Sequence, residues 1–129
     1  MPLQYSVAVR NARLDAVARV VGPAPILELR SGSPPAACDA APGGTLLAAG
    51  ALPEIWMAPA AAGLKSKVGE WRLLGRAAGK IGHYRLVAAG ICHEQGTVGA
   101  DGVMRTDRAE IEPGQTVNVL VYTKTCGND

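Results

Sequence analysis

The sequence predicts a mainly β fold, a jelly-roll-like antiparallel β-sandwich of about eight short strands with one N-terminal α-helix. Glycine supplies 16 and proline 9 of the 129 residues, which favours short strands joined by turns over a helix bundle. After Pro25, stretches in which apolar and polar residues alternate recur about every ten residues. The length suits a single domain over 1–129, with the helix at 3–21 and the β-sandwich at 25–125.

The apolar side chains are mostly aliphatic. Aromatic residues make up only 4% of the chain, with no Phe, two Trp and three Tyr. Because rings supply the largest buried area per residue, this composition predicts a thin core. We therefore expect Trp56 and Trp71 to be buried, and part of the apolar surface to be covered by a partner.

Residues 3–21 have the periodicity of an amphipathic helix, which Gly22-Pro23 ends. The apolar arc consists of Leu3, Val7, Leu14, Val17, Val20 and Val21. The opposite side consists of Gln4, Asn11, Asp15 and Arg19. Arg10 and Arg13 lie inside the apolar arc, where they either extend along it to reach water or pair with carboxylates of a neighbouring subunit.

Alternating segments bounded by turn residues follow the helix. The expected strands are Ile26–Arg30, Thr45–Ala51, Val68–Leu74, Gly82–Ala88, Ile91–Val98, Val103–Thr106, Ala109–Ile111 and Thr116–Thr123. Residues 34–44 lack periodicity and are expected to form an exposed connection, whereas 58–66 form either a flexible insertion or a short helix. In the last strand, Val117, Val119 and Val121 share one face.

Charge is distributed unevenly along the chain. Residues 65–85 carry six basic residues against Glu70 alone, whereas 86–129 carry three basic and six acidic residues. The six basic residues are Lys65, Lys67, Arg72, Arg76, Lys80 and Arg85. They form either a solvated face or a surface that matches the charge of a neighbouring copy. The net charge of +2 gives little support to a nucleic-acid groove, so no direct nucleic-acid partner is expected.

The N-terminus lacks the basic and apolar regions of a signal peptide, and no apolar run reaches the roughly 18 residues of a membrane span. We therefore expect no membrane contact and synthesis in a cytosol. In that compartment Cys38, Cys92 and Cys126 are expected to be reduced thiols, with a Cys38–Cys92 disulfide left open as an alternative.

Few residues suit catalysis or metal binding. The serines occur in no nucleophile-elbow context, and Cys92 and His93 are adjacent in a predicted strand, so they point to opposite faces. His83 and His93 can face each other across a hairpin, but no zinc-binding spacing accompanies them. We expect no enzymatic activity, cofactor or metal, and a protein that acts through its surface.

The chain carries a series of short segments whose order and spacing resemble those of a known family. They are Tyr5-Ser6, Ala8-Val9-Arg10-Asn11-Ala12, Leu14-Asp15-Ala16, Arg30-Ser31-Gly32, Pro34-Pro35-Ala36, Cys38, Leu52-Pro53, Trp56-Met57, Gly82-His83-Tyr84-Arg85, Cys92-His93, Gln95-Gly96-Thr97-Val98 and Gly114-Gln115-Thr116-Val117. This series is similar to a family of small virion structural proteins of tailed bacteriophages and prophages. The resemblance covers most of the chain and is weakest at 39–44, 58–67 and 99–108.

The resemblance implies a non-enzymatic virion component, most like a capsid decoration (cement) protein made in the bacterial host cytoplasm and bound to the capsid exterior. Its partners would be the phage major capsid protein and further copies of itself, as a dimer or trimer at a symmetry axis. The candidate contact residues are Leu3, Val7, Arg10, Arg13, Leu14, Lys65, Lys67, Arg72, Arg76 and Lys80. One alternative is a tail, neck or baseplate component. Another is a host-surface or glycan-binding module, which requires Trp56, Trp71 and Tyr84 to be exposed.

Overall fold

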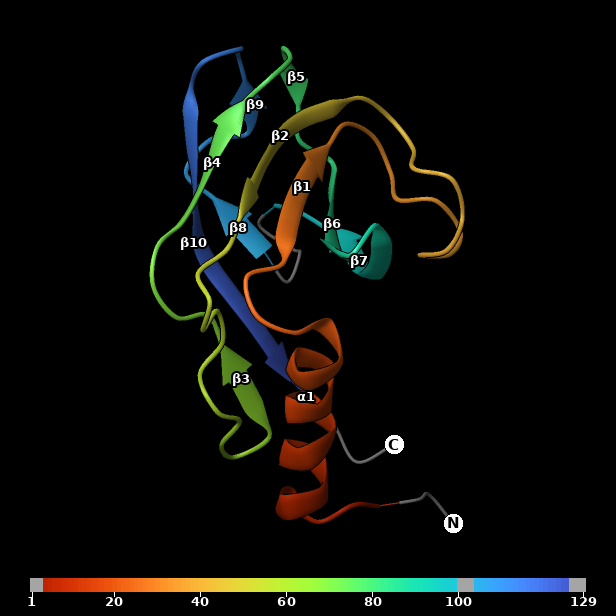
Figure 1. Ribbon diagram of the computed structural model, residues 1–129, viewed down its shortest axis with the longest axis vertical. Coiled ribbons are helices and arrows are strands. Elements are labelled where there is room, and N and C mark those ends of the chain that lie inside the picture. Colours follow the sequence, from red (N-terminus) through yellow and green to blue (C-terminus); the bar gives the residue numbers. More distant parts are fainter. Residues whose placement is uncertain (1–3, 100–103, 126–129) are drawn as a thin grey trace.

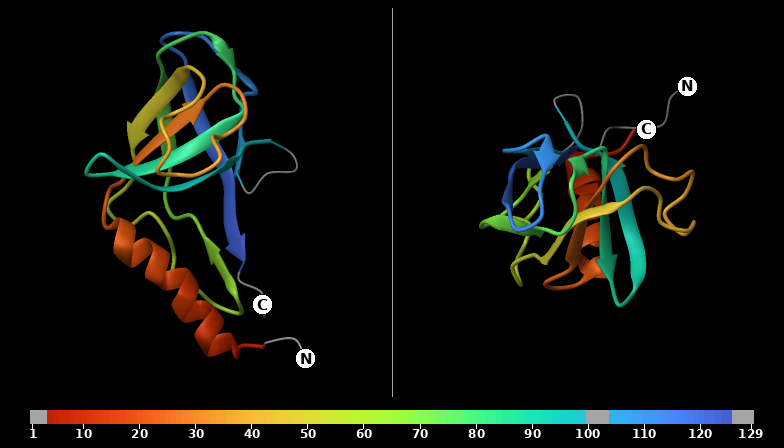
Figure 2. Two further views of the ribbon diagram at one scale, coloured as in Figure 1. Left: turned by 90° about the vertical axis from the view of Figure 1, so that its right-hand side faces the viewer. Right: turned by 90° about the horizontal axis from the view of Figure 1, so that it is seen from above.

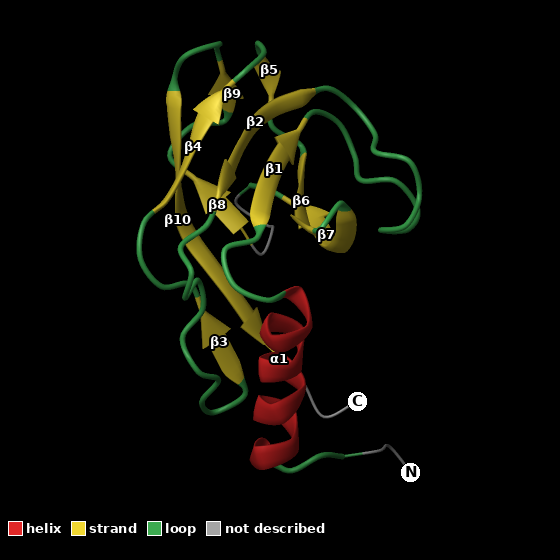
Figure 3. Cartoon of the chain, viewed as in Figure 1, coloured by secondary structure: helices red, strands yellow, loops and turns green. Residues whose placement is uncertain are grey.

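The computed structural model describes residues 4–99 and 104–125, which form one helix and ten strands (Figure 1). In chain order the elements are α1 (Val7–Val21), β1 (Ile26–Arg30), β2 (Leu46–Ala51), β3 (Leu64–Ser66), β4 (Trp71–Gly75), β5 (Gly79–Lys80), β6 (His83–Ala88), β7 (Ile91–Thr97), β8 (Met104–Thr106), β9 (Glu110–Ile111) and β10 (Thr116–Thr125). The helix lies at one end of the molecule, beside β3 (Figure 3). The predicted mainly β fold with one N-terminal helix is confirmed.

One antiparallel sheet curls around the core. Its strands follow the order β3-β10-β4-β2-β1-β6-β7, and β8 pairs with β10 outside this path. A bridge from Val98 to Met104 links the segment after β7 to β8, so the sheet curls back on itself in a sandwich-like shape (Figure 2). β5 and β9 form a separate two-stranded sheet.

The interior of the curled sheet contains a stack of four rings. Trp56 lies 6.0 Å from Trp71 of β4, and Trp71 lies 5.1 Å from Tyr122 of β10, measured between ring centroids. Tyr122 meets Tyr84 of β6 edge to face at 6.0 Å. All four rings are buried, which confirms the expectation for both tryptophans. The exposed Trp56, Trp71 and Tyr84 that a glycan-binding module requires are therefore not found.

The helix begins later than predicted. Ser6 is its N-cap, with an extended backbone and a hydroxyl that accepts a hydrogen bond from the Val9 N–H at 3.2 Å. The helix therefore starts at Val7, and Leu3 lies outside the described residues. Gly22 ends the helix as predicted, with φ at 87° and its N–H donating to the Ala18 carbonyl at 3.0 Å.

Two strands, β3 and β5, were not predicted. β3 lies in the segment expected as an insertion or a short helix, and it forms by pairing Leu64–Ser66 with Thr123–Thr125 of β10. This partner is distant in sequence, so no local pattern reveals the strand. β4 starts at Trp71 instead of Val68, because the Val68 N–H donates to the Trp56 carbonyl at 2.9 Å. Val103 of the strand predicted at Val103–Thr106 lies outside the described residues.

A β-bulge changes which side chains of β10 face the core. Val119 pairs with Thr106 but Val121 pairs with Arg105, so Leu120 is an extra residue in the ladder. Val117 and Val119 are buried as predicted, whereas Val121 is largely exposed and Tyr122 is buried in its place. The prediction that the three valines share one face is therefore wrong at Val121, and the bulge is what brings Tyr122 into the ring stack.

Gly96→Ala tests the packing of this stack. A Cβ at Gly96 would lie 2.9 Å from Cε1 of the Tyr84 ring, whereas a Cβ at Gly43 would have no neighbour closer than 3.8 Å. We expect Gly96→Ala to lower the free energy of unfolding by about 1–3 kcal/mol in urea titrations, because the buried ring has to move. Gly43→Ala is the matched control, and equal effects of the two substitutions would contradict this packing.

Candidate functional site

The side of α1 that carries Asn11 and Asp15 faces into the molecule. Asn11 Oδ1 accepts a hydrogen bond from the Gly63 N–H at 2.9 Å, and Asp15 Oδ1 accepts one from the Ala60 N–H at 2.9 Å. Both donors belong to the loop before β3. The sequence places these two side chains on the solvent side of the helix, and the structure uses them to attach it.

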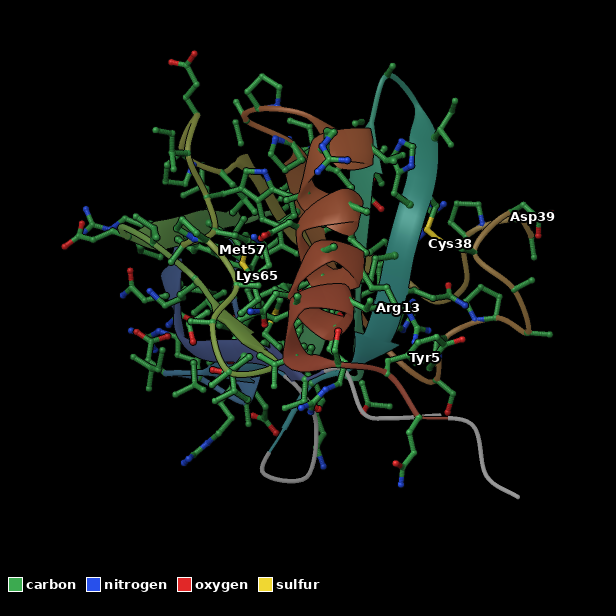
Figure 4. All side chains as sticks on the ribbon, turned by 90° about the horizontal axis from the view of Figure 1, so that it is seen from below. Tyr5, Arg13, Cys38, Asp39, Met57 and Lys65 are labelled. Carbon is green, nitrogen blue, oxygen red and sulfur yellow. A yellow bond between two sulfur atoms is a disulfide. The ribbon has the colours of Figure 1, made fainter. Side chains whose placement is uncertain are left out.

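Lys65 of β3 completes this attachment. Its ammonium lies 2.5 Å from Asp15 Oδ1 and donates to the Ala58 carbonyl at 2.9 Å, and the side chain is only 5% exposed. The hydrogen bond from Lys65 is the main cause that holds the pKa of Asp15 below its ordinary value, with the Ala60 N–H adding to it. Figure 4 shows Lys65 beside the helix. Lys65 was predicted to contact a partner, and this is wrong because α1 buries it.

The attachment leaves apolar side chains of α1 in water. Leu14 and Val21 are buried, so Leu14 is not the contact residue that the sequence predicts, whereas Val7, Val9 and Val20 are exposed, Val20 at 70%. Spacings of four and three residues along the helix place Val9, Arg13, Ala16 and Val20 on one side, which we call the outer helix face. A groove of about 260 Å³ borders this face. It is lined by Ala16, Val17, Val20, Val21 and His93.

The two arginines of the predicted apolar arc differ in their surroundings. Arg13 is exposed, and its guanidinium lies 5.0 Å from the centroid of the Tyr5 ring (Figure 4). Arg10 is half-buried, and its Nε is shielded from water and has no hydrogen-bond partner among the described residues. Arg13 therefore belongs to the outer helix face, and Arg10 borders it.

The basic residues of 65–85 do not form one patch. Lys67 donates to its neighbour Gly69 at 2.9 Å, and Arg72 pairs with Glu70 at 3.2 Å in water. Arg76 is exposed. Lys80, by contrast, lines a cleft of about 260 Å³ together with Arg105 and Arg108, two residues from another part of the chain. Sequence reasoning missed these two because β8 and β9 bring them to Lys80 only in the fold.

The two histidines lie far apart in the hairpin that was expected to bring them together. His83 pairs with Thr97, is fully buried, and its Nδ1 lies 2.9 Å from the Gly32 carbonyl. His93 is the extra residue of a bulge in β7 and borders the helix groove. The prediction that they can face each other is therefore wrong. Within the described part of the chain, no group of three His, Cys, Asp or Glu side chains is placed to hold a metal ion.

Cys38 and Cys92 form a disulfide across 54 residues, with 5.5 Å between their Cα atoms. The expectation of reduced thiols is therefore wrong for this pair, and the alternative that the sequence left open is correct. Figure 4 shows Cys38 beside the strand that carries its partner. Cys126 lies outside the described residues. The bridge attaches the long 31–45 connection to β7.

Glu94 of β7 is the acceptor at the end of the ring stack. Its Oε2 accepts hydrogen bonds from the hydroxyls of Tyr84, at 2.6 Å, and Tyr122, while its Oε1 lies 2.5 Å from Lys124 Nζ. Burial raises the pKa of both phenols well above the ordinary value, and the carboxylate of Glu94 raises it further. Every polar atom of this cluster has a partner within it, so the cluster serves the fold.

Comparison of the chain with protein-family models, with curated proteins and with solved structures finds no match. In the described ranges, no helix has both the length and the apolar character needed to cross a membrane. The candidate binding features among the described residues include the outer helix face with its groove, the cleft at Lys80, and a pocket lined by both disulfide cysteines, Cys38 and Cys92.

Asp15→Asn tests the attachment of the helix. Because the folded-state pKa of Asp15 is lowered, its contribution to stability is present above about pH 4, the ordinary Asp value, and is lost as the pH falls through the lowered pKa. We expect the free energy of unfolding of the variant to be about 1–3 kcal/mol lower than that of wild type at neutral pH. This loss is smaller than the loss for a fully buried ion pair, because the Asp15 side chain is 35% exposed. Urea unfolding across the acid range measures this, and the difference from wild type should shrink with acid. Glu70→Gln, which removes an exposed ion pair, should change little, and a pH-independent loss for Asp15→Asn would contradict the account.

Alkaline titration tests the Glu94 cluster. Since the folded-state pKa of Tyr84 and of Tyr122 is raised, both phenols contribute stability below about pH 10 that is lost as the pH rises further. We expect neither to form phenolate until the chain unfolds, as followed by phenolate absorbance. Glu94→Gln removes the nearby negative charge and should bring phenolate formation to lower pH. Glu112→Gln, at an exposed position, should leave the titration unchanged, and phenolate formation by both buried tyrosines in folded wild-type protein would refute the assignment.

Proposed function

We propose that this protein is a structural component of a bacteriophage virion, a capsid decoration protein that binds the major capsid protein on the outside of the shell. The observation that carries the proposal is the outer helix face with its groove. Val20 is exposed beside the groove lined by Ala16, Val17 and Val21, and an apolar surface of this kind is characteristic of sites that bind another protein. The proposal also rests on the order and spacing of short segments in this chain, which resemble those of small virion proteins.

The way the helix is attached favours this use. Asn11, Asp15 and Lys65 hold α1 by polar contacts at its inward side, so the helix stays in place while Val9 and Val20 remain available. A partner that covers these valines gains their apolar area without any rearrangement of the helix. Repeated over many copies on one shell, contacts that are weak individually sum to a strong attachment.

A variant of the outer helix face tests the proposal. The double substitution Val9→Gln and Val20→Gln changes exposed side chains, so the fold should keep its stability while incorporation into particles falls at least about tenfold. Leu74→Gln, an equally exposed leucine on β4, is the matched control and should be incorporated normally. Incorporation is measured by quantitative gel of purified particles made in cells that express each variant. Unchanged incorporation of the double variant would refute the role of this face.

The copy number of the wild-type protein separates the shell from other places in the virion. A decoration protein should be present in hundreds of copies per particle, whereas a ring in the tail, neck or baseplate contains about six to twelve. Particles that lack the protein should also lose resistance to heat. A low copy number would replace the capsid assignment by the tail, neck or baseplate, and absence from particles would refute the proposal.

A further inference from the structure

A pocket of about 570 Å³ lies on the outer side of the sheet, between β1, β6 and the 31–45 connection. Its charged residues are Glu28, Arg30, Arg85 and Asp39. The pairing of Glu28 with Arg85 across β1 and β6 places both side chains on the same face, and Leu27 and Leu29 point to the core instead. The pocket therefore shares no wall with the ring stack or with the outer helix face.

The floor of the pocket has more positive than negative charge. Glu28 Oε1 accepts a hydrogen bond from Arg30 Nε at 3.0 Å, and the same oxygen lies 3.5 Å from Arg85 Nη1. Two guanidinium groups thus share one carboxylate oxygen. Asp39 is exposed at the rim and forms no ion pair with either arginine in the described structure. An anion in the pocket would balance the second guanidinium.

Arg85 is the group that most needs such an anion. The residue is only 8% exposed, and its Nε is shielded from water and has no hydrogen-bond partner among residues 4–99 and 104–125. A buried guanidinium is costly unless its N–H groups and its charge are matched. Carboxylates match it best, because their two oxygens accept two parallel N–H bonds.

The other walls of the pocket are apolar and held in place. They include Val87, the exposed Ile91, and Ala40, Ala41 and Pro42 of the connection. The disulfide from Cys38 to Cys92 attaches this wall to β7, and Gln95 Nε2 donates to the Pro35 carbonyl at 2.8 Å as a second attachment. Because this wall is already fixed, little conformational entropy is lost when a ligand binds against it.

We propose that this pocket binds an aliphatic carboxylate, with the carboxylate on Arg30 and Arg85 and the hydrocarbon part against Val87, Ile91 and Pro42. The carboxylate belongs either to a free small molecule or to the C-terminal residue of a peptide. This site is independent of the capsid role, because none of its residues lies on the outer helix face.

Isothermal titration with hexanoate tests the proposal on the oxidised full-length chain, with hexanol as the uncharged control. We expect hexanoate to bind and hexanol to bind at least about tenfold more weakly, since only the former supplies the anion. Arg85→Lys keeps the positive charge but loses the planar guanidinium that can donate to both carboxylate oxygens, so it should weaken hexanoate binding about tenfold or more. Arg30→Lys provides the same test if Arg85→Lys does not fold, as judged by circular dichroism. Arg72→Lys, on an exposed arginine outside the pocket, is the matched control and should bind as wild type.

Two further experiments identify the source of the carboxylate and the role of the disulfide-bonded wall of the pocket. Binding of the dipeptide acetyl-Ala-Val but not of its C-terminal amide assigns a peptide terminus, whereas binding of hexanoate alone assigns a free small molecule. Cys38→Ser with Cys92→Ser releases the wall and should weaken binding several-fold while the fold is kept. Equal affinity for hexanoate and hexanol, or undiminished hexanoate binding in the folded arginine variants, would overturn the proposal.

Discussion

The stack of Trp56, Trp71, Tyr122 and Tyr84 is the contact on which the rest of the fold depends. Its rings come from the loop after β2 and from β4, β10 and β6, so one continuous contact joins strands that are distant in the sequence. The stack ends on Glu94, whose carboxylate accepts from both tyrosine hydroxyls and thus adds β7 to the same unit. A chain with only five aromatic residues gains most from its rings by placing four of them in contact.

The helix is attached to this core by a different kind of contact. Leu14 and Val21 reach the interior, but Asn11 and Asp15 fix the helix by binding backbone N–H groups and the buried Lys65. A buried ammonium without a carboxylate would be strongly destabilising, so the pair specifies one orientation of the helix. That orientation leaves the outer helix face in water, and the proposed contact with a capsid protein follows from it.

The outer side of the sheet also carries an ion-paired group of side chains, and a loop fixed by a disulfide covers it. Glu28 faces Arg30 and Arg85 on neighbouring strands, and the connection that covers them is tied down by the Cys38–Cys92 bridge. Strand pairing decides that Arg85 meets Glu28, while the disulfide decides that the pair lies in a pocket instead of open solvent. Two surfaces with different chemistry, one apolar and one lined by paired charges, therefore arise on one small core.

Local patterns in the sequence determined the helix, most strands and the burial of both tryptophans, because amphipathic period, turn residues and ring size act within a few residues. Contacts between distant residues determined the rest. The ion pair with Lys65 holds the polar side of the helix against the protein. The bulge at Leu120 places Tyr122 in the core instead of Val121. Pairing with β10 makes the segment around Leu64 a strand. The candidate contact residues changed for the same reason. The sequence pattern identifies Leu14 as part of the apolar arc and Lys65 as part of the basic segment. Only packing decides whether such a side chain faces a partner or the protein's own interior.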